Sequence, residues 1–285
     1  MKYNTSVVIC THNRKEHLLK AIRTFKKIKK SYFGLVVIDS SDKKLNNSES
    51  KGIDNYIYDG TTKPLSPKRN IAIKRVKADF IIFTDDDCIP AKNWFSEIME
   101  PFSDYKVACV TGRTIPFGEF KKSDFEKIFT FDNLGREKMV IQRHFGLQNL
   151  WRFGHGNNMA FRASIFREVG LFDERLGVGT EGKAGEDVDM FYRIYKAGYK
   201  IVFNPNAVIL HKHIAKQDLV KWAQNNTYAS HSVLFKHHDF NTTLLFLAGI
   251  FKLKIDILKA IISGDNLKAK IKFYSLLGWI GLKAK

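Results

Sequence analysis

Cysteine is scarce in this sequence: only Cys10, Cys88 and Cys109 occur among 285 residues. Their number is odd, they stand far apart, and their neighbours are apolar. Small secreted domains held together by disulfides carry many cysteines, so a disulfide framework is excluded. We therefore expect three reduced thiols in the core of a cytoplasmic protein.

Long hydrophobic runs and targeting signals are also missing. No uninterrupted apolar stretch reaches the roughly 20 residues that a membrane-spanning helix needs. The chain starts directly with a strand-like segment, so we expect no signal peptide. The patterns G-x-G-x-x-G and G-x-x-x-x-G-K-[ST] do not occur either. Their absence leaves a dinucleotide-binding fingerprint and a P-loop ATPase without support.

Acidic residues are too few to balance the basic ones. The chain has 47 Lys and Arg against 29 Asp and Glu, a formal net charge of +18. Such a charge attracts polyanions, which include nucleic acids, anionic membrane surfaces and phosphorylated ligands. Basicity alone does not choose among these partners. The apolar content of 44% is enough for a sizeable core, so a wholly disordered chain is excluded.

The stretch at 80–90, FIIFTDDDCIP, is the most informative part of the chain. Its apolar run has the length and composition of a strand buried on both faces of a parallel sheet. Asp85, Asp86 and Asp87 follow that run at once. Three adjacent carboxylates repel one another unless a cation lies among them. The arrangement therefore favours a hard divalent cation completed by phosphate, and the alternative is an acidic loop after a core strand.

Other short apolar runs have the same strand character, at 6–10, 35–38, 56–58, 107–111, 201–203 and 207–210. Helical patterns lie between them, at 18–25, 70–76, 94–102, 164–169 and 186–195. This alternation predicts an α/β protein with a Rossmann-like, mostly parallel sheet flanked by helices. Ligands of such sheets bind beyond the carboxyl ends of the strands.

The character of the chain changes after about residue 238. Residues 244–251 are almost wholly apolar, and the following 252–279 mix lysines with Leu, Ile, Phe, Tyr and Trp. Basic helices with an apolar side that carries Trp are typical of membrane interfaces. We therefore predict an amphipathic helical tail that contacts an anionic membrane. The alternative is that its helices simply pack on the preceding domain.

Seven short motifs follow one another along the chain. They are SVVICTHNR (6–14), VVIDSSD (36–42), SPKRNIAI (66–73), IIFTDDDCIP (81–90), GHGNNMAFR (154–162), VGLFDERL (169–176) and GEDVDMFYRIYKAGYKI (185–201). Together they make residues 3–215 resemble a family 2 glycosyltransferase with the GT-A fold. IIFTDDDCIP matches the DxD motif of that family. The Gln-x-x-Arg-Trp motif and membrane spans of the processive synthases are missing, which favours transfer of a single sugar.

The resemblance implies roles for the acidic residues. Asp85 and Asp87 match the two aspartates of the DxD motif and would bind Mn²⁺ or Mg²⁺, with Asp85 and Asp86 also near the nucleotide-sugar. Asp187 matches the catalytic base, and Glu186 is the alternative base. A carboxylate in this role accepts the proton of the acceptor hydroxyl. At a helix start, the carboxylate of Asp187 would also be stabilised by the helix dipole.

The remaining site predictions follow from the same resemblance. His211 is the expected third metal ligand, with His213 as second candidate, since imidazole binds Mn²⁺. The expected nucleotide-sugar contacts are Thr11, Asn13, Arg14, Asp39, Arg69, Asn70 and Asn158. The competing interpretation of Asp39 is a turn-forming or capping residue.

The predicted function is inverting, metal-dependent transfer of one sugar from a nucleotide-diphosphate sugar, preferably UDP-linked, to a hydroxyl of a glycan or lipid-linked glycan. We expect a catalytic domain at 1–215, with a nucleotide-binding half at 1–110 and an acceptor half at 111–215. A helical extension at 216–285 would hold the enzyme at the inner face of the cell membrane. A sugar-phosphate nucleotidyltransferase and a basic nucleic-acid-binding protein are the alternatives. The sequence lacks the signature of the first and any binding module of the second.

Overall fold

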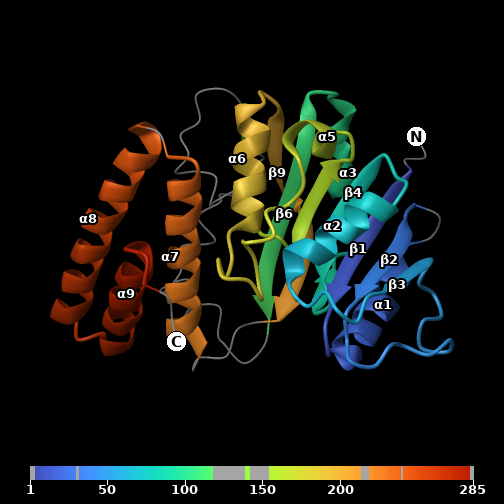
Figure 1. Cartoon of the computed structure of the whole chain (residues 1–285), viewed down its shortest axis with the longest axis horizontal. Helices are drawn as coiled ribbons and strands as arrows, with labels where there is room; N and C mark the ends of the chain where they lie inside the picture. The colour runs from blue at the N-terminus through green and yellow to red at the C-terminus, as the bar shows by residue number, and fades with distance from the viewer. Residues whose placement is uncertain are drawn as a thin grey trace.

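The computed structural model describes residues 4–29, 32–117, 139–141, 154–212, 218–238 and 240–282 (Figure 1). Its strands are β1 (Thr5–Thr11), β2 (Gly34–Asp39), β3 (Asn55–Tyr58), β4 (Phe80–Asp85), β5 (Cys88–Pro90), β6 (Val107–Phe117), β7 (Met139–Ile141), β8 (Asn158–Arg162) and β9 (Lys200–Lys212). Its helices are α1 (Lys15–Lys29), α2 (Leu65–Arg75), α3 (Trp94–Met99), η1 (Glu100–Ser103), α5 (Ile165–Val169), α6 (Glu186–Lys196), α7 (Leu219–Lys236), α8 (Phe240–Ile262) and α9 (Asn266–Trp279).

One sheet runs through the molecule in the order β3-β2-β1-β4-β8-β6-β9-β5, and β7 also pairs with β9. The first four strands in this order are all parallel. Beyond β4 the sheet is mixed, because β8 runs antiparallel to both of its neighbours and β6 pairs in parallel with β9. The predicted α/β fold with a sheet flanked by helices is confirmed.

The two strand segments expected at 201–203 and 207–210 form one continuous strand, β9. Its pairing with β6 shifts register between Gly112 and Arg113, so the two long strands stay paired across an irregularity. Strand β6 itself extends to Phe117, six residues past the expected end at 111. A bulge of this kind absorbs extra residues without ending the ladder.

Two hydrophobic layers cover the two faces of the sheet. Side chains of α2, α5 and α6 pack on one face, and those of α1 and α3 pack on the other. The run Phe80–Phe83 of β4 is at most 5% exposed, because it lies between both layers. The prediction of a strand buried on both faces is therefore confirmed, and it explains the absence of polar alternation in that run.

The carboxyl ends of the parallel strands lie together. Thr11 of β1 pairs with Asp39 of β2, and Cys10 pairs with Asp85 of β4. Because parallel strands end at the same edge, the polar residues that follow them meet there. This edge carries the candidate site.

The C-terminal helices α7, α8 and α9 form a bundle beside the sheet domain, at the left of Figure 1. Helix α7 joins the two parts, since Val233 belongs to the same core as α6. Within the described residues, no helix is long and apolar enough to cross a bilayer. The predicted boundary at 215 lies outside the described residues, so the division at that position stays a prediction.

Candidate active site

The three consecutive aspartates have different partners at the edge of the sheet. Asp86 is buried; its Oδ2 accepts a hydrogen bond from Thr11 Oγ1 at 2.7 Å, and its Oδ1 lies 2.9 Å from Arg14 Nη1. Burial raises the pKa of Asp86 to about 6 in spite of these partners. Asp87 accepts from Arg14 Nη2, whereas Asp85 is partly exposed. Asp86 is thus the most deeply buried of the three, with a side chain 3% exposed against 10% for Asp87 and 32% for Asp85.

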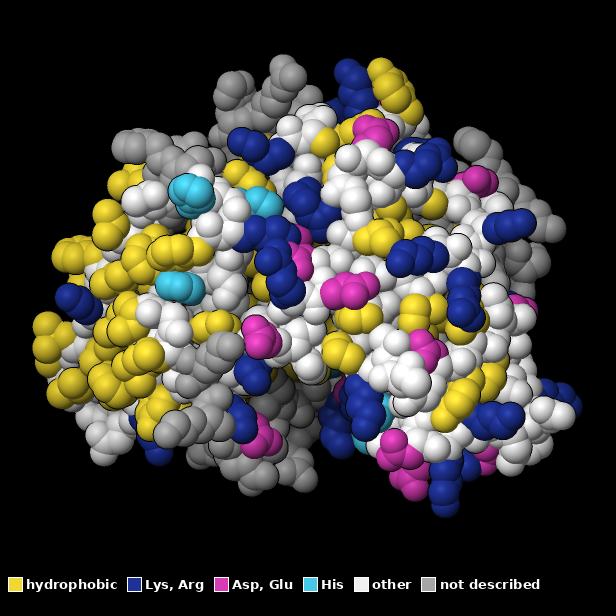
Figure 2. All heavy atoms as spheres, viewed as in Figure 1, with side chains coloured by type: hydrophobic (Ala, Val, Ile, Leu, Met, Phe, Trp, Pro, Cys, Tyr) yellow, Lys and Arg dark blue, Asp and Glu magenta, His cyan; other side chains and the backbone are white. Residues whose placement is uncertain are grey.

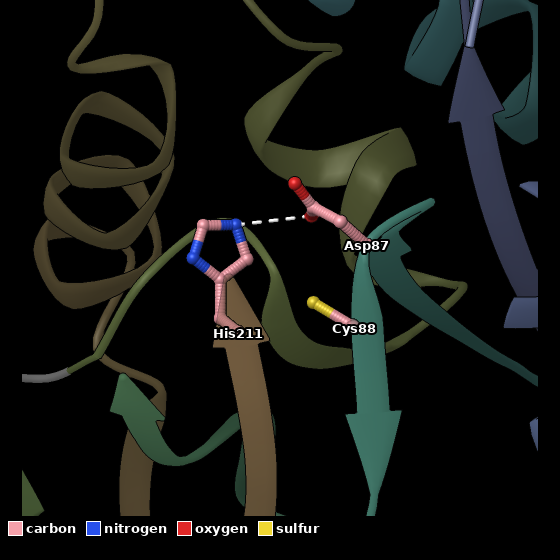
Figure 3. A group of neighbouring side chains, drawn as sticks. All are labelled: Asp87, Cys88 and His211. Carbon is pink, nitrogen blue, oxygen red and sulfur yellow. Dashed lines mark ion pairs between the residues drawn. The ribbon is translucent and has the colours of Figure 1, made fainter. Parts of the chain in front are cut away.

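His211 faces the two outer aspartates from β9. Its Nε2 lies 3.1 Å from Asp87 Oδ1 and 3.8 Å from Asp85 Oδ2 (Figure 3). Burial opposes the charged imidazolium, but the contact of its Nε2 with the Asp87 carboxylate and the charge of Asp85 outweigh burial and raise the pKa of His211. The pKa of Asp87 is held well below its usual range, because His211 and Arg14 outweigh the effect of burial.

These residues fit a hard divalent cation. Asp87 Oδ1 is buried without a regular hydrogen bond, and His211 Nε2 lies 3.1 Å from it, so both atoms could bind one cation. The potential ligand atoms of Asp87, Cys88 and His211 lie within 4.8 Å of one another. Burial raises the pKa of Cys88 well above its usual value, so this thiol stays protonated. Two carboxylates and an imidazole are therefore the donor set, and they suit Mn²⁺ better than a soft metal.

A second polar cluster follows the first two strands. The backbone N–H of Asn13, at φ +53°, donates to Ser41 Oγ, and its side chain exchanges hydrogen bonds with Asp42. Asp39 is buried and accepts from the backbone N–H of Ser41 and from Tyr56 Oη. Burial, followed by the carboxylate of Asp39, raises the pKa of Tyr56. The contact with Ser41 is that of a turn-forming residue, the competing interpretation of Asp39. A nucleoside contact of Asp39 stays a prediction.

Lys68 is a charged residue of this edge that the sequence did not single out. Its side chain is buried, and Nζ donates to Thr11 O at 3.0 Å and Ser40 Oγ at 3.2 Å. Burial lowers its pKa. The motif SPKRN contains Lys68 beside Arg69, so a sequence signal for a basic site was present. Only the fold shows that the Lys68 ammonium reaches the ends of β1 and β2.

Arg69 links the acidic edge to helix α6. Its Nη1 lies 2.7 Å from Glu186 Oε1, and its Nη2 donates to Gly156 O at 2.9 Å. The guanidinium also lies 5.6 Å from the ring of Phe83 and 5.4 Å from that of Phe172. A buried arginine keeps its charge. Burial raises the pKa of Asp85, and the charge of Arg69 opposes that rise.

Asp187 and Glu186 begin helix α6 but have different environments. Asp187 is partly exposed; its Oδ2 accepts from the Gly156 N–H at 2.9 Å and its Oδ1 from the Val188 N–H at 2.8 Å. Burial raises the pKa of Asp187 although Arg69 and these N–H groups lower it. Glu186 is buried against Arg69, and burial together with the charge of Asp187 raises its pKa.

A cavity of about 290 Å³ lies between the metal-binding set and helix α6. Its lining includes four residues predicted from sequence, Arg69, Asp85, Glu186 and His211. Asp187 contacts the wall at Gly156. The lining residues to which the sequence gave no role include His155, Leu219, Trp222 and Asn226.

Two of these additional groups have clear physical properties. Burial is the main cause that lowers the pKa of His155 to about 4, so its imidazole is neutral at physiological pH. Leu219, Trp222 and Asn226 belong to α7 and bring the C-terminal bundle to the cavity. No sequence motif marks them; only the packing of α7 on α6 does.

Asn70 and Asn158, which were predicted to contact the nucleotide-sugar, form hydrogen bonds within the fold. Asn70 donates to Phe172 O and to Glu174 Oε1 and accepts from the Phe172 N–H, each at 2.9 Å. Asn158 is fully buried; it accepts from Trp94 Nε1 at 2.9 Å and donates to Ala207 O at 2.9 Å. Both amides join elements of the fold, and a contact of either one with a nucleotide-sugar stays a prediction. His213 lies outside the described residues.

The chain resembles several curated glycosyltransferases. It is 26% identical over 185 residues to the pre-mycofactocin glycosyltransferase of Mycobacterium tuberculosis, a match that covers 64% of this chain and 37% of that protein. It is 28% identical over 187 residues to the O-antigen chain rhamnosyltransferase RfbN of Salmonella typhimurium, covering 63% of this chain and 57% of that one. The matched region thus spans only about a third to somewhat over half of these relatives.

Solved structures share the fold. The mannosyltransferase PcManGT from Pyrobaculum calidifontis, in complex with GDP-Man and Mn²⁺, has a TM-score of 0.66 at 13% identity, covering 98% of this chain and 86% of that chain. GalNAc-T7 with UDP, GalNAc and Mn²⁺ has a TM-score of 0.57 at 18% identity, covering 81% and 50%. The model of glycosyl transferase family 2 matches residues 6–170. Because this match covers more than half of the chain, the chain belongs to glycosyl transferase family 2.

Proposed function

We propose that this protein transfers one sugar from a nucleotide-diphosphate sugar to a hydroxyl of a glycan or lipid-linked glycan, with inversion at the anomeric carbon. One observation carries the proposal: a single cavity is lined by Asp85 and His211 on one side and by Glu186 on the other, with Asp187 held against its wall. Sugar transfer needs both halves, a charged site for the leaving diphosphate and a carboxylate for the acceptor.

Asp85, Asp87 and His211 would hold Mn²⁺ or Mg²⁺. When bound, the cation neutralises charge that develops on the leaving diphosphate. Arg14 supports the set by holding Asp87, whose low pKa keeps it ionised. Structures with the same fold contain Mn²⁺, which favours that ion.

Thr11, Asn13, Arg14 and Asp39 follow β1 and β2 at the edge where the nucleotide would lie. Thr11 and Arg14 contact Asp86 and so help to hold the acidic turn in place. Part of their effect on nucleotide binding would therefore come from positioning this turn. Arg69 supplies positive charge on the far side of Asp85. We prefer a UDP-linked donor; the structural relatives hold both GDP and UDP donors, so the base has to be measured.

Asp187 would act as the general base. Glu186 is buried and paired with Arg69, so it is the less accessible carboxylate of the two. Asp187 instead accepts only N–H groups and is partly exposed. The acceptor hydroxyl gives its proton to Asp187 and its oxygen attacks the anomeric carbon, while the bond from that carbon to the diphosphate oxygen breaks. Attack from the opposite face inverts the configuration.

Nucleotide binding is the direct test. The wild-type protein is titrated calorimetrically with UDP, GDP and dTDP, each in Mn²⁺, in Mg²⁺ and in EDTA. We expect one nucleotide to bind, and EDTA to abolish the binding. Asp87→Asn should lose it, while Asp218→Asn, at an exposed position before α7, should bind normally. Absence of metal-dependent binding of all three would contradict the proposed site.

The remaining proposals concern organisation and place. We propose that residues 1–110 bind the nucleotide and that 111–215 bind the acceptor, in one catalytic domain. The helical extension at 216–285 contributes to the acceptor side through α7, since Trp222 and Asn226 line the cavity. We place the protein in the cytoplasm, at the inner face of the membrane, and we do not expect nucleic acid to be its partner.

A further inference from the structure

Helix α8 exposes a continuous apolar stripe to solvent. Leu244, Leu247, Phe251, Ile255, Leu258 and Ile262 recur every three or four residues, and each is between 37% and 77% exposed. That spacing places them on one face of the helix. Figure 2 shows hydrophobic side chains gathered over this side of the molecule, at the left of the view. We call these six residues the α8 stripe.

The α8 stripe is not the unfinished core of the bundle, because α8 has a separate inner face. The ring of Phe246 stacks on that of Trp279 of α9, with centroids 6.2 Å apart, and Trp279 Nε1 donates to Phe246 O at 2.8 Å. A Cβ on Gly249 would lie 2.4 Å from the Trp279 ring, so the two helices are in close contact there. Ala260 is buried on the same side. None of the described helices therefore covers the stripe.

Lysines border the α8 stripe. At about 100° per residue, Lys252 and Lys259 lie along one edge and Lys254 along the other. All three are exposed, and in the described part of the chain none of them forms an ion pair. The acid of this helix, Asp256, is instead directed to Lys272 of α9, at 3.5 Å. The apolar face is thus framed by positive charge.

This combination selects the occupant. An anionic bilayer offers hydrocarbon for the stripe and negative head groups for the lysines. A second copy of the chain would bring the same lysines together and would join two molecules of formal charge +18, which repel each other. The stripe is about 27 Å long for 18 residue steps, and its opposite face is covered by protein, so α8 lies along a surface.

We propose that the α8 stripe docks the protein onto an anionic membrane, with α8 parallel to the bilayer surface. This inference rests on the proposed function for its purpose, since a lipid-linked acceptor is confined to the membrane. Helix α7 packs against α9 and also contributes Trp222 to the cavity. The membrane-docked bundle and the cavity are therefore parts of one connected structure.

Vesicle flotation of the full chain tests the proposal. We compare phosphatidylcholine vesicles with vesicles that also contain phosphatidylglycerol, and expect binding to the second kind only. The double variant Phe251→Ser/Leu258→Ser should bind at least about tenfold more weakly, since two exposed apolar anchors are lost. The control Tyr105→Ser removes an aromatic side chain of 76% exposure elsewhere and should bind normally.

Charge is tested separately. Lys252→Gln/Lys254→Gln/Lys259→Gln should weaken binding by about 100-fold. The control Lys43→Gln/Lys44→Gln/Lys51→Gln changes the net charge equally, on exposed positions of the sheet domain, and should have a much smaller effect.

Three outcomes would overturn the proposal. They are no binding of the wild type to anionic vesicles, equal binding by the Phe251→Ser/Leu258→Ser variant, and a wild-type dimer that this variant converts to monomer in sedimentation velocity. The last outcome would assign the stripe to a second copy. Metal-dependent nucleotide binding, measured on the same preparations, should be unchanged by every variant. Loss of lipid binding with intact nucleotide binding therefore bears on the membrane face alone.

Discussion

Arg69 and Glu186 form a buried ion pair between α2 and α6, with Nη1 2.7 Å from Oε1 and side chains only 2% and 7% exposed. The pair brings two elements that are more than 100 residues apart in sequence to one wall of the cavity. It also determines which acidic residue of α6 is neutralised. Glu186 has a permanent counter-charge, whereas its neighbour Asp187 accepts hydrogen bonds from the N–H groups of Gly156 and Val188.

Arg69→Met should strongly destabilise the fold, by about 3–5 kcal/mol, because Glu186 would remain buried without a counter-charge. The free energy of unfolding is measured in urea. The control Arg175→Met breaks a pair in which the arginine is 79% exposed, and it should leave stability nearly unchanged. Arg69→Met/Glu186→Gln should recover part of the loss. If the double variant is as unstable as the sum of the single ones, the two side chains are not energetically coupled.

Asp187→Asn should lower turnover by about 10²–10⁴-fold while nucleotide affinity is unchanged, since only the proton acceptor is removed. Oδ1 of the new side chain can still accept an N–H group, so the helix start is retained. Glu186→Gln is the comparison: we expect less loss of turnover. A larger loss in Glu186→Gln than in Asp187→Asn, at equal stability, would reassign the base to Glu186.

The rate should rise with pH. Burial raises the pKa of Asp187, so its protonated form persists to higher pH than for an ordinary aspartate. Because the base acts only when deprotonated, turnover falls as the pH drops through this raised pKa. The stability contribution has the opposite direction: protonated Asp187 favours the folded state at low pH, and this gain is lost as pH rises through the folded pKa. Turnover measured under saturating donor from pH 4 to 8 checks the first statement. A rate independent of pH over that range would argue against Asp187.

Loss of the imidazole should weaken the metal site. His211→Ala should reduce Mn²⁺-dependent nucleotide affinity by about tenfold or more, because it removes one of three ligand side chains. His238→Ala, on an exposed position beyond α7, is the matched control. Calorimetric titration of the nucleotide in Mn²⁺ and in EDTA compares the two. Equal affinity for His211→Ala and wild type in Mn²⁺ would remove His211 from the ligand set.

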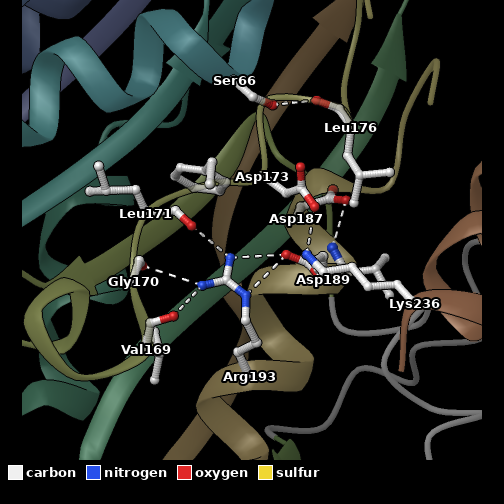
Figure 4. Close-up of polar contacts among 12 residues, drawn as sticks. Ser66, Val169, Gly170, Leu171, Asp173, Leu176, Asp187, Asp189, Arg193 and Lys236 are labelled. Atoms are coloured by element: carbon white, nitrogen blue, oxygen red, sulfur yellow. Dashed lines mark hydrogen bonds and ion pairs between the residues drawn. The ribbon is translucent and has the colours of Figure 1, made fainter. Parts of the chain in front are cut away.

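Asp189 should hold helix α7 on the catalytic domain. This fully buried carboxylate lies 2.9 Å from Arg193 Nη2 and 2.7 Å from Lys236 Nζ (Figure 4). It also lies 2.7 Å from His237 Nε2. Asp189→Asn removes the charge that these groups share, so amide hydrogen exchange should become faster in 219–236. Asp218→Asn is the control, because the Asp218 side chain makes no capping hydrogen bond. Unchanged exchange in α7 of Asp189→Asn would show that apolar packing alone holds the helix.

The local sequence pattern was sufficient to predict the strands and the acidic turn. Phe80–Phe83 is apolar without alternation, and a strand covered on both faces is the structure that buries it. Asp85 ends this strand and Asp87 follows it, at a ligand-binding edge. The same period-based reasoning finds the α8 stripe, since an amphipathic helix shows its exposed face in its spacing. Such features depend on neighbours in sequence.

Contacts across the fold were decided by tertiary structure. Asn70 and Asn158 stand within family motifs, yet their amides are used by Phe172 and Ala207, more than 45 residues away. Trp222 and His155 reach the cavity only because α7 packs on α6 and the 154–158 turn crosses β6. The sequence by itself determined most of the element types and the position of the acidic turn, because both follow from periodicity and strand ends. Which side chains meet in the cavity depends on packing between distant elements, and no local pattern encodes that.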